Sequence, residues 1–158
     1  MTTEVIKGSF PNVGFITAGT KNIIVLPVNT QGLLELTPMY RRFKYHFKNT
    51  ARVYEADCFF NNEPVGSAPW YEENGYIIFL LFYKQYEVGN KQNLEETKLS
   101  ANFLTALNKM IKTVEDKWLH HEDKLNIYSP MIPFAGPKSR IETSALKAKW
   151  HFVQEGVL

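Results

Sequence analysis

The residues best placed to do chemistry form one short stretch, Asn29-Thr30-Gln31-Gly32, which follows directly on the apolar run 23–28. A continuous run of Ile, Val and Leu predicts a strand that is buried on both faces of a parallel sheet. Open α/β sheets bind their ligands at the carboxyl ends of such strands. Asn29 and Gly32 therefore lie where a small phosphorylated molecule would be held, although Asn29 could instead cap a local turn.

Other kinds of site find little support in the sequence. Cys58 falls in an apolar stretch and is interpreted as a core residue rather than a nucleophile. No Gly-x-Ser-x-Gly elbow, Walker loop or zinc motif occurs. The histidines have no metal-ligand spacing with Cys58; they are His46, His120, His121 and His151. The sequence therefore predicts neither a metal nor a cofactor.

Hydrophobic periodicity and turn residues predict how these residues are positioned. Thr37-Pro38 starts a helix whose buried face carries Tyr40, Phe43 and Phe47, and Asn74-Gly75 predicts a hairpin. The expected strands span 4–9, 13–17, 22–28, 67–71, 75–83 and 124–128. The expected helices begin at Pro38 and span 51–60, 93–118 and 141–152. Segment 130–140 is expected to be a loop, and 153–158 a short strand or a frayed end. Strands that alternate with helices predict one α/β domain, 1–158, with a mostly parallel sheet.

Bulk composition limits the class of protein. The chain has 158 residues, 44% of them apolar, and a formal net charge of +2, so nothing in the balance requires nucleic acid or a membrane. Arg41, Lys44 and Lys48 are interpreted as the solvated side of a helix, with a nucleic-acid contact as the alternative. The lone Cys58 fits a reducing compartment, and no secretory signal precedes the first strand. We expect a cytoplasmic location, in a cell or in a virus-infected host cell.

The order of the elements and four local motifs resemble the macrodomain family, whose members bind or cleave ADP-ribose. The motifs are Ile6-Lys7-Gly8-Ser9-Phe10, Leu26-Pro27-Val28-Asn29-Thr30-Gln31-Gly32, Arg42-Phe43-Lys44 with Phe47, and Tyr76 to Lys84 with the helix that follows. The last of these resembles the branch that removes ADP-ribose from DNA bases or from protein carboxylates. The resemblance implies a three-layer fold with a central mixed, mostly parallel sheet flanked by helices.

The resemblance also implies a ligand site whose two phosphate loops have degenerated. Ser9 stands where the family has an Asp that binds adenine, so a charge-assisted contact is lost. The glycine-rich run after the family's Asn is replaced by residues 33–38, and the second loop, 132–140, keeps only Gly136. The residues expected to contact the ligand are Ser9, Asn29, Thr30, Gln31, Gly32, Leu33, Leu34, Ile132, Phe134, Ala135, Gly136, Lys138, Ser139 and Arg140.

One catalytic feature of that branch has a counterpart here. Its members use a lysine at the end of the central strand, and Lys84 falls at that position. A partly desolvated lysine can act as a nucleophile or a base. Because the branch's acidic partner has no counterpart, Glu142 or water would have to transfer the proton.

Two functional hypotheses follow. The first is a divergent macrodomain that binds an ADP-ribose-like nucleotide or an ADP-ribosylated substrate, with residual hydrolase activity through Lys84. The second is a protein-interaction or inhibitor module on the same scaffold, for example a phage protein that antagonises a host enzyme, with Leu33, Leu34 and Phe134 filling the cleft or forming an exposed apolar surface. Lys138, Ser139 and Arg140 could contact phosphate directly, or Ser139 could cap a helix. Nucleic acid is expected only as a modified substrate, and no membrane contact is expected.

Overall fold

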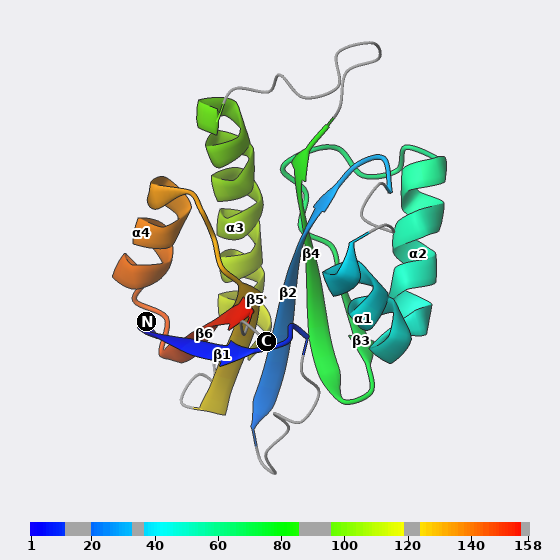
Figure 1. Cartoon of the computed structure of the whole chain (residues 1–158). Helices are drawn as coiled ribbons and strands as arrows, with labels where there is room; N and C mark the ends of the chain where they lie inside the picture. The colour runs from blue at the N-terminus through cyan, green and yellow to red at the C-terminus, as the bar shows by residue number, and fades with distance from the viewer. Residues whose placement is uncertain (12–19, 33–36, 86–95, 119–123, 156–158) are drawn as a thin grey trace.

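A computed structural model of the chain describes residues 1–11, 20–32, 37–85, 96–118 and 124–155 (Figure 1). They form a six-stranded sheet with the strand order β1-β6-β5-β2-β4-β3. All neighbouring strands are parallel except β3 and β4. The strands are β1 (Thr2–Gly8), β2 (Lys21–Asn29), β3 (Trp70–Glu73), β4 (Tyr76–Lys84), β5 (Leu125–Pro130) and β6 (Ala148–Glu155).

Helices cover both faces of the sheet and complete three layers. The helices are α1 (Pro38–His46), α2 (Lys48–Phe59), α3 (Glu96–Trp118) and α4 (Ala135–Thr143). Helices α1 and α2 lie on one face and α3 and α4 on the other (Figure 1). The predicted α/β fold with a central, mostly parallel sheet is therefore confirmed.

The two long apolar runs, β2 and β4, are buried because each strand contributes side chains to two separate cores. Along β4, Ile77, Phe79 and Leu81 face α3 and α4, whereas the intervening Ile78 and Leu80 face α1 and α2. Strand β2 divides its side chains in the same way. A central strand of this kind has no wet face, so its sequence is continuously hydrophobic rather than alternating.

The local start and turn signals are confirmed. The Thr37 hydroxyl accepts a hydrogen bond from the Tyr40 amide at 3.1 Å and caps α1. Asn74 and Gly75 both have positive φ, +54° and +81°, as a tight turn between antiparallel strands requires. These features depend on a few consecutive residues, which is why a sequence pattern finds them.

The predicted helix 141–152 is wrong, and so is the loop 130–140. Helix α4 already begins at Ala135 and ends at Thr143, and 148–155 form strand β6. Ala148, Trp150 and Phe152 face the core under α3 and α4 with a period of two, whereas Val153 faces the other core, as in a strand. Ser139 lies inside α4, whose cap residue is Phe134, so Ser139 is not a helix cap. The predicted strand 13–17 lies outside the described residues.

Helix α2 begins three residues before its predicted start. The carboxylate of Glu73, on β3, accepts hydrogen bonds from the amides of Asn49 and Thr50 at 3.1 and 2.8 Å. It also accepts one from the Thr50 hydroxyl at 2.8 Å. A carboxylate at this position satisfies amides that the first turn leaves without partners and complements the helix dipole. The start of α2 is therefore fixed by a residue from another element.

Candidate functional site

The candidate site lies at the carboxyl ends of β2, β4 and β5. Asn29 and Lys84, at the ends of neighbouring parallel strands, are register partners. The chain leaves β2 toward α1 and α2, but leaves β5, the other neighbour of β2, toward α4 on the opposite face (Figure 1). Connections that leave adjacent strands in opposite directions open a crevice, and α/β sheets bind ligands there. By this rule, the candidate crevice lies between the ends of β2 and β5.

The first of these loops, residues 29–32, is held by polar contacts. The side-chain oxygen of Asn29 accepts a hydrogen bond from the Gln31 amide at 2.9 Å. The buried Tyr54 hydroxyl donates to the Asn29 carbonyl at 2.9 Å, and it lies 3.3 Å from the side-chain oxygen. The Thr30 amide donates to the Lys84 carbonyl at 3.0 Å. Asn29 thus shapes its own turn, as one of the two interpretations of the sequence expected.

Gly32 and Cys58 lie close together where the 29–32 loop contacts α2. Gly32 has φ +72°, and a Cβ at this position would lie 3.6 Å from the Cβ of Cys58. The Cys58 sulfur lies 3.7 Å from the Asn29 carbonyl oxygen. Burial raises the pKa of the Cys58 thiol, which favours its protonated form.

Lys84 ends β4 beside this loop and is half-buried. The alternation along β4 places it on the same side as Phe82, which faces α1 and α2. Tyr54 reaches Asn29 from that side too, because it belongs to α2. Asn29 and Lys84 therefore lie at one edge of the sheet.

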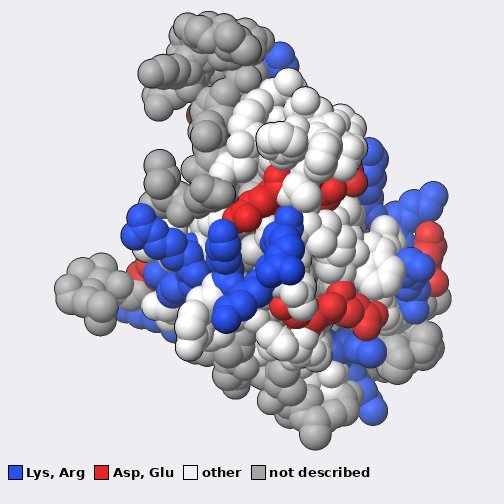
Figure 2. Space-filling view, turned by 90° about the vertical axis from the view of Figure 1, so that its right-hand side faces the viewer, with Lys and Arg blue, Asp and Glu red and all other residues white. Residues whose placement is uncertain are grey.

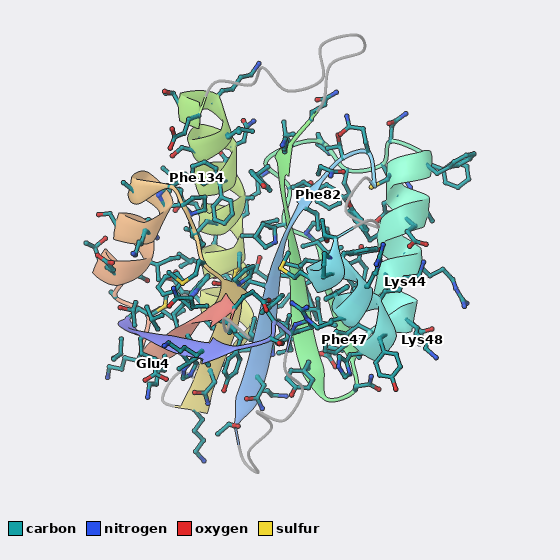
Figure 3. The ribbon with its side chains drawn as sticks, in the orientation of Figure 1. Glu4, Lys44, Phe47, Lys48, Phe82 and Phe134 are labelled. Atoms are coloured by element: carbon teal, nitrogen blue, oxygen red, sulfur yellow. The ribbon has the colours of Figure 1, made fainter. Side chains whose placement is uncertain are left out.

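The second loop, which connects β5 to α4, is held by aromatic packing. The Phe134 ring lies 5.8 Å from the Phe103 ring and 6.1 Å from the Tyr83 ring, between centroids, and only 8% of Phe134 is exposed. Ile132 is buried in the same core. At the end of β5, the Ser129 hydroxyl accepts a hydrogen bond from the Trp150 indole at 2.8 Å. Figure 3 shows Phe82 and Phe134 on opposite sides of the sheet near this edge.

The start of α4, which follows β5, is exposed. Ala135 and Gly136 are exposed in the first turn, which has no acidic residue. Amides of a first helical turn lack partners in the helix and attract anions. The cations of α4 are engaged elsewhere: the Lys138 amine lies 5.9 Å from the centre of the Phe152 ring, and the Arg140 guanidinium donates to Asn108 at 2.8 Å.

Not all of the predicted site residues come together. Asn29 and Lys84 are paired at the ends of β2 and β4, and α4 starts after β5, the other neighbour of β2. Ser9 follows β1 and is exposed, with β6 and β5 between its strand and β2. Ile132 and Phe134 belong to the core. Leu33 and Leu34 lie outside the described residues.

The sequence analysis missed Tyr54 and gave Cys58 no part in the site. Both lie on α2 and hold the loop from below. A signal existed, because Phe47, Ala51, Tyr54 and Cys58 recur at the spacing of one helical face. That stripe identifies the side of α2 that packs on the sheet, but it does not reveal which strand end the side meets.

Two general site classes find no support among the residues described. No cluster of three or more His, Cys, Asp or Glu side chains in this part of the chain could hold a metal ion. None of its helices is both long and apolar enough to cross a bilayer.

A hollow of about 680 Å³ lies at the opposite edge of the sheet, at the amino ends of β5 and β6, and its lining includes Lys124, Asn126 and Lys149.

Comparisons with known proteins agree with the fold. No protein-family model matches the sequence. No curated protein matches it either. Among solved structures, the macrodomain of Thermus aquaticus DarG superposes with a TM-score of 0.63 at 17% identity, covering 96% of this chain and 97% of that one. The macrodomain of Mycobacterium tuberculosis DarG gives 0.62 at 12% identity over 98% and 99%. Thermosipho africanus DarTG in complex with ADP-ribose gives 0.58 at 15% identity over 89% of this chain and 39% of that one. The chain therefore has the macrodomain fold.

Proposed function

We propose that this protein binds an ADP-ribose-like nucleotide in the crevice between the 29–32 loop and the start of α4. The observation that carries the proposal is that Asn29, paired with Lys84, ends β2 beside the switch point between β2 and β5, where an exposed helix start follows β5. The macrodomain fold supports it, since a solved structure with this fold, DarTG, is in complex with ADP-ribose.

The crevice suits an elongated, anionic ligand. The amides of Ala135 and Gly136 would hold the diphosphate in place of the glycine-rich loops that the family uses. Ser9 follows β1, which lies three places from β2, about 14 Å away at about 4.8 Å per strand. The adenine would lie toward Ser9 and the distal ribose between Asn29 and Lys84.

Turnover is the narrower part of the proposal. Lys84 would act on the distal ribose as a base or nucleophile, as in the branch that this sequence resembles. Glu142 is exposed in the last turn of α4, about 10 Å along the helix from its first residue, so it is poorly placed to be the acid partner. Water would then move the proton, and slow hydrolysis is expected beside ordinary binding.

Calorimetry with ADP-ribose tests the binding. We expect a dissociation constant in the micromolar range, about −8 kcal/mol, and weaker binding of AMP and of ribose 5-phosphate, which each fill half of the crevice. Lys84→Ala should weaken binding modestly and abolish any hydrolysis. The control Lys112→Ala removes an exposed lysine of α3 and should change neither. A flat trace with ADP-ribose and with ADP-ribosylated substrates would contradict the proposal.

A second candidate function is a protein-interaction or inhibitor module on the same fold. One observation favours it: in the 132–140 segment, Ile132, Phe134, Lys138 and Arg140 contact the protein itself. Side chains that already contact the protein itself leave fewer groups in this segment to bind a ligand. Co-purification of a stoichiometric protein partner that survives Lys84→Ala, together with absent nucleotide binding, would support this function over the first.

A further inference from the structure

The outer surface of the α1–α2 layer carries a second hollow, distinct from the crevice. It is a groove of about 540 Å³ between the two helices, lined by Arg41, Lys44, Tyr45, Lys48, Arg52 and Glu55. Figure 2 shows lysine and arginine side chains gathered on this face of the molecule. Lys44 and Lys48 point outward from the helices, away from the sheet (Figure 3). We call this hollow the basic groove.

The basic groove concentrates the positive charge of the protein. Its four cations and one carboxylate give a formal charge of +3. The whole chain carries 18 basic and 16 acidic residues, a formal +2, so the remainder of the chain has a net charge of −1. The low overall charge, which argued against nucleic acid, therefore hides a local excess. A local excess of this kind attracts polyanions.

The single carboxylate of the groove is already neutralised. Glu55 accepts a hydrogen bond from the Lys44 amine at 2.7 Å and another from the Tyr40 hydroxyl at 3.1 Å. In the described part of the chain, no carboxylate lies within ion-pair distance of Arg41, Lys48 or Arg52. These three cations are exposed and can bind an external anion.

An exposed aromatic ring stands among the cations. Tyr45 is 73% exposed, and its ring meets His46 edge-on, with 5.1 Å between centroids and 84° between planes. A large apolar ring at such exposure contributes little to stability. Proteins that bind single-stranded nucleic acid combine basic side chains with exposed aromatic side chains. The phosphates bind the cations, and a base stacks on the ring.

We propose that the basic groove binds a single strand of nucleic acid, with Arg41, Lys48 and Arg52 on successive phosphates and Tyr45 stacked on a base. A duplex keeps its bases stacked inside and offers none to Tyr45. An anionic membrane or an acidic peptide would use the cations but would leave the ring without a role. The groove shares no residue with the crevice, so this inference does not depend on the proposed nucleotide binding.

Fluorescence anisotropy with a labelled 12-nucleotide single strand, at 50 to 200 mM NaCl, tests the proposal. The triple variant Arg41→Gln, Lys48→Gln, Arg52→Gln should weaken binding at least tenfold. It should also flatten the slope of log K against log salt by about 2, since each phosphate contact of a single strand contributes about 0.7. Tyr45→Ala should weaken binding by about tenfold, whereas Tyr45→Phe, which keeps the ring, should bind as the parent does.

The matched control removes the same charge from α3, through Lys98→Gln, Lys109→Gln and Lys112→Gln, all exposed. It should change the dissociation constant by less than about twofold, and thermal melts should show that all variants are folded. Equal weakening by both triple variants would overturn the proposal, because net charge alone would explain it. Equal affinity for a duplex of the same length would overturn it as well. So would binding to phosphatidylserine vesicles without binding to the single strand.

Discussion

The two loops that flank the crevice are held in different ways. The 29–32 loop depends on hydrogen bonds from Tyr54 and Gln31 and on the positive φ of Gly32. The loop between β5 and α4 depends on Phe134, which packs with rings from α3 and β4. Polar contacts set local geometry and contribute modestly to stability, whereas a buried ring supports the whole core. Changes in the first loop should therefore act mainly on the ligand, and changes in the second mainly on folding.

The largest effect is expected at Phe134. Phe134→Ala removes a ring that contacts Phe103 and Tyr83 and should lower the free energy of unfolding by about 3 kcal/mol, measured by urea denaturation. The control Met131→Ala changes a residue of the same loop that is 40% exposed and should stay within about 0.5 kcal/mol. A loss below about 1 kcal/mol for Phe134→Ala would mean that rings do not hold this loop.

Tyr54→Phe should have an intermediate effect. It keeps the ring in the core but removes the hydroxyl that binds Asn29, so the carbonyl of Asn29 loses a buried donor. We expect a loss of about 1 kcal/mol in the free energy of unfolding and a clear loss of ADP-ribose affinity by calorimetry. Unchanged affinity in a destabilised variant would show that the 29–32 loop does not shape the ligand site.

Glycine substitutions compare the two loops directly. Gly32→Ala places a side chain at φ +72° and should cost about 1 kcal/mol while also weakening ligand binding. Gly136→Ala lies in the first turn of α4, where a Cβ would meet the Ser100 hydroxyl at an ordinary 3.6 Å. It should leave stability unchanged or slightly raised, because alanine favours a helix. Identical melting temperatures for both variants would show that the backbone at Gly32 is no more sensitive to a side chain than the backbone at Gly136.

The smallest effect belongs to neither loop. At the β1–β6 edge, His151 hydrogen-bonds Glu4 and Asn126, and burial lowers the pKa of His151. Partial burial pushes the pKa of Glu4 up, but the bonds from His151 and Lys149 outweigh it and lower that pKa. In both cases the unfolded chain binds protons more readily, so stability falls below about pH 6.5 as His151 protonates and further below about pH 4.5.

Urea midpoints at pH 7.5 and pH 5 measure this pH dependence. His151→Phe keeps a ring against Tyr128 and should flatten the change between the two pH values. Phe134→Ala should shift both midpoints by a similar amount and keep the difference between them. If the pH dependence vanishes in Phe134→Ala but survives in His151→Phe, then His151 is not its source.

Local signals made much of the fold predictable. The continuous apolar runs of β2 and β4, the Thr37-Pro38 start of α1 and the Asn74-Gly75 turn each depend on consecutive residues. The same runs located Asn29 and Lys84 at strand ends, and the structure confirms that the two residues share one edge. Strand burial and turn conformation are encoded within a few residues, so periodicity is enough to find them.

The sequence by itself determined which segments are buried strands, where the first helix starts and which polar residues follow the central strands. Only the tertiary structure decided that 148–155 is a strand, because its backbone is satisfied by β1 and β5 from distant parts of the chain. Only the fold supplied Glu73 to start α2 and Tyr54 to hold Asn29. It also brought α1 and α2 together around the basic groove. The physical reason is the same each time: these features depend on groups that are distant in sequence, and no local pattern encodes which distant group arrives.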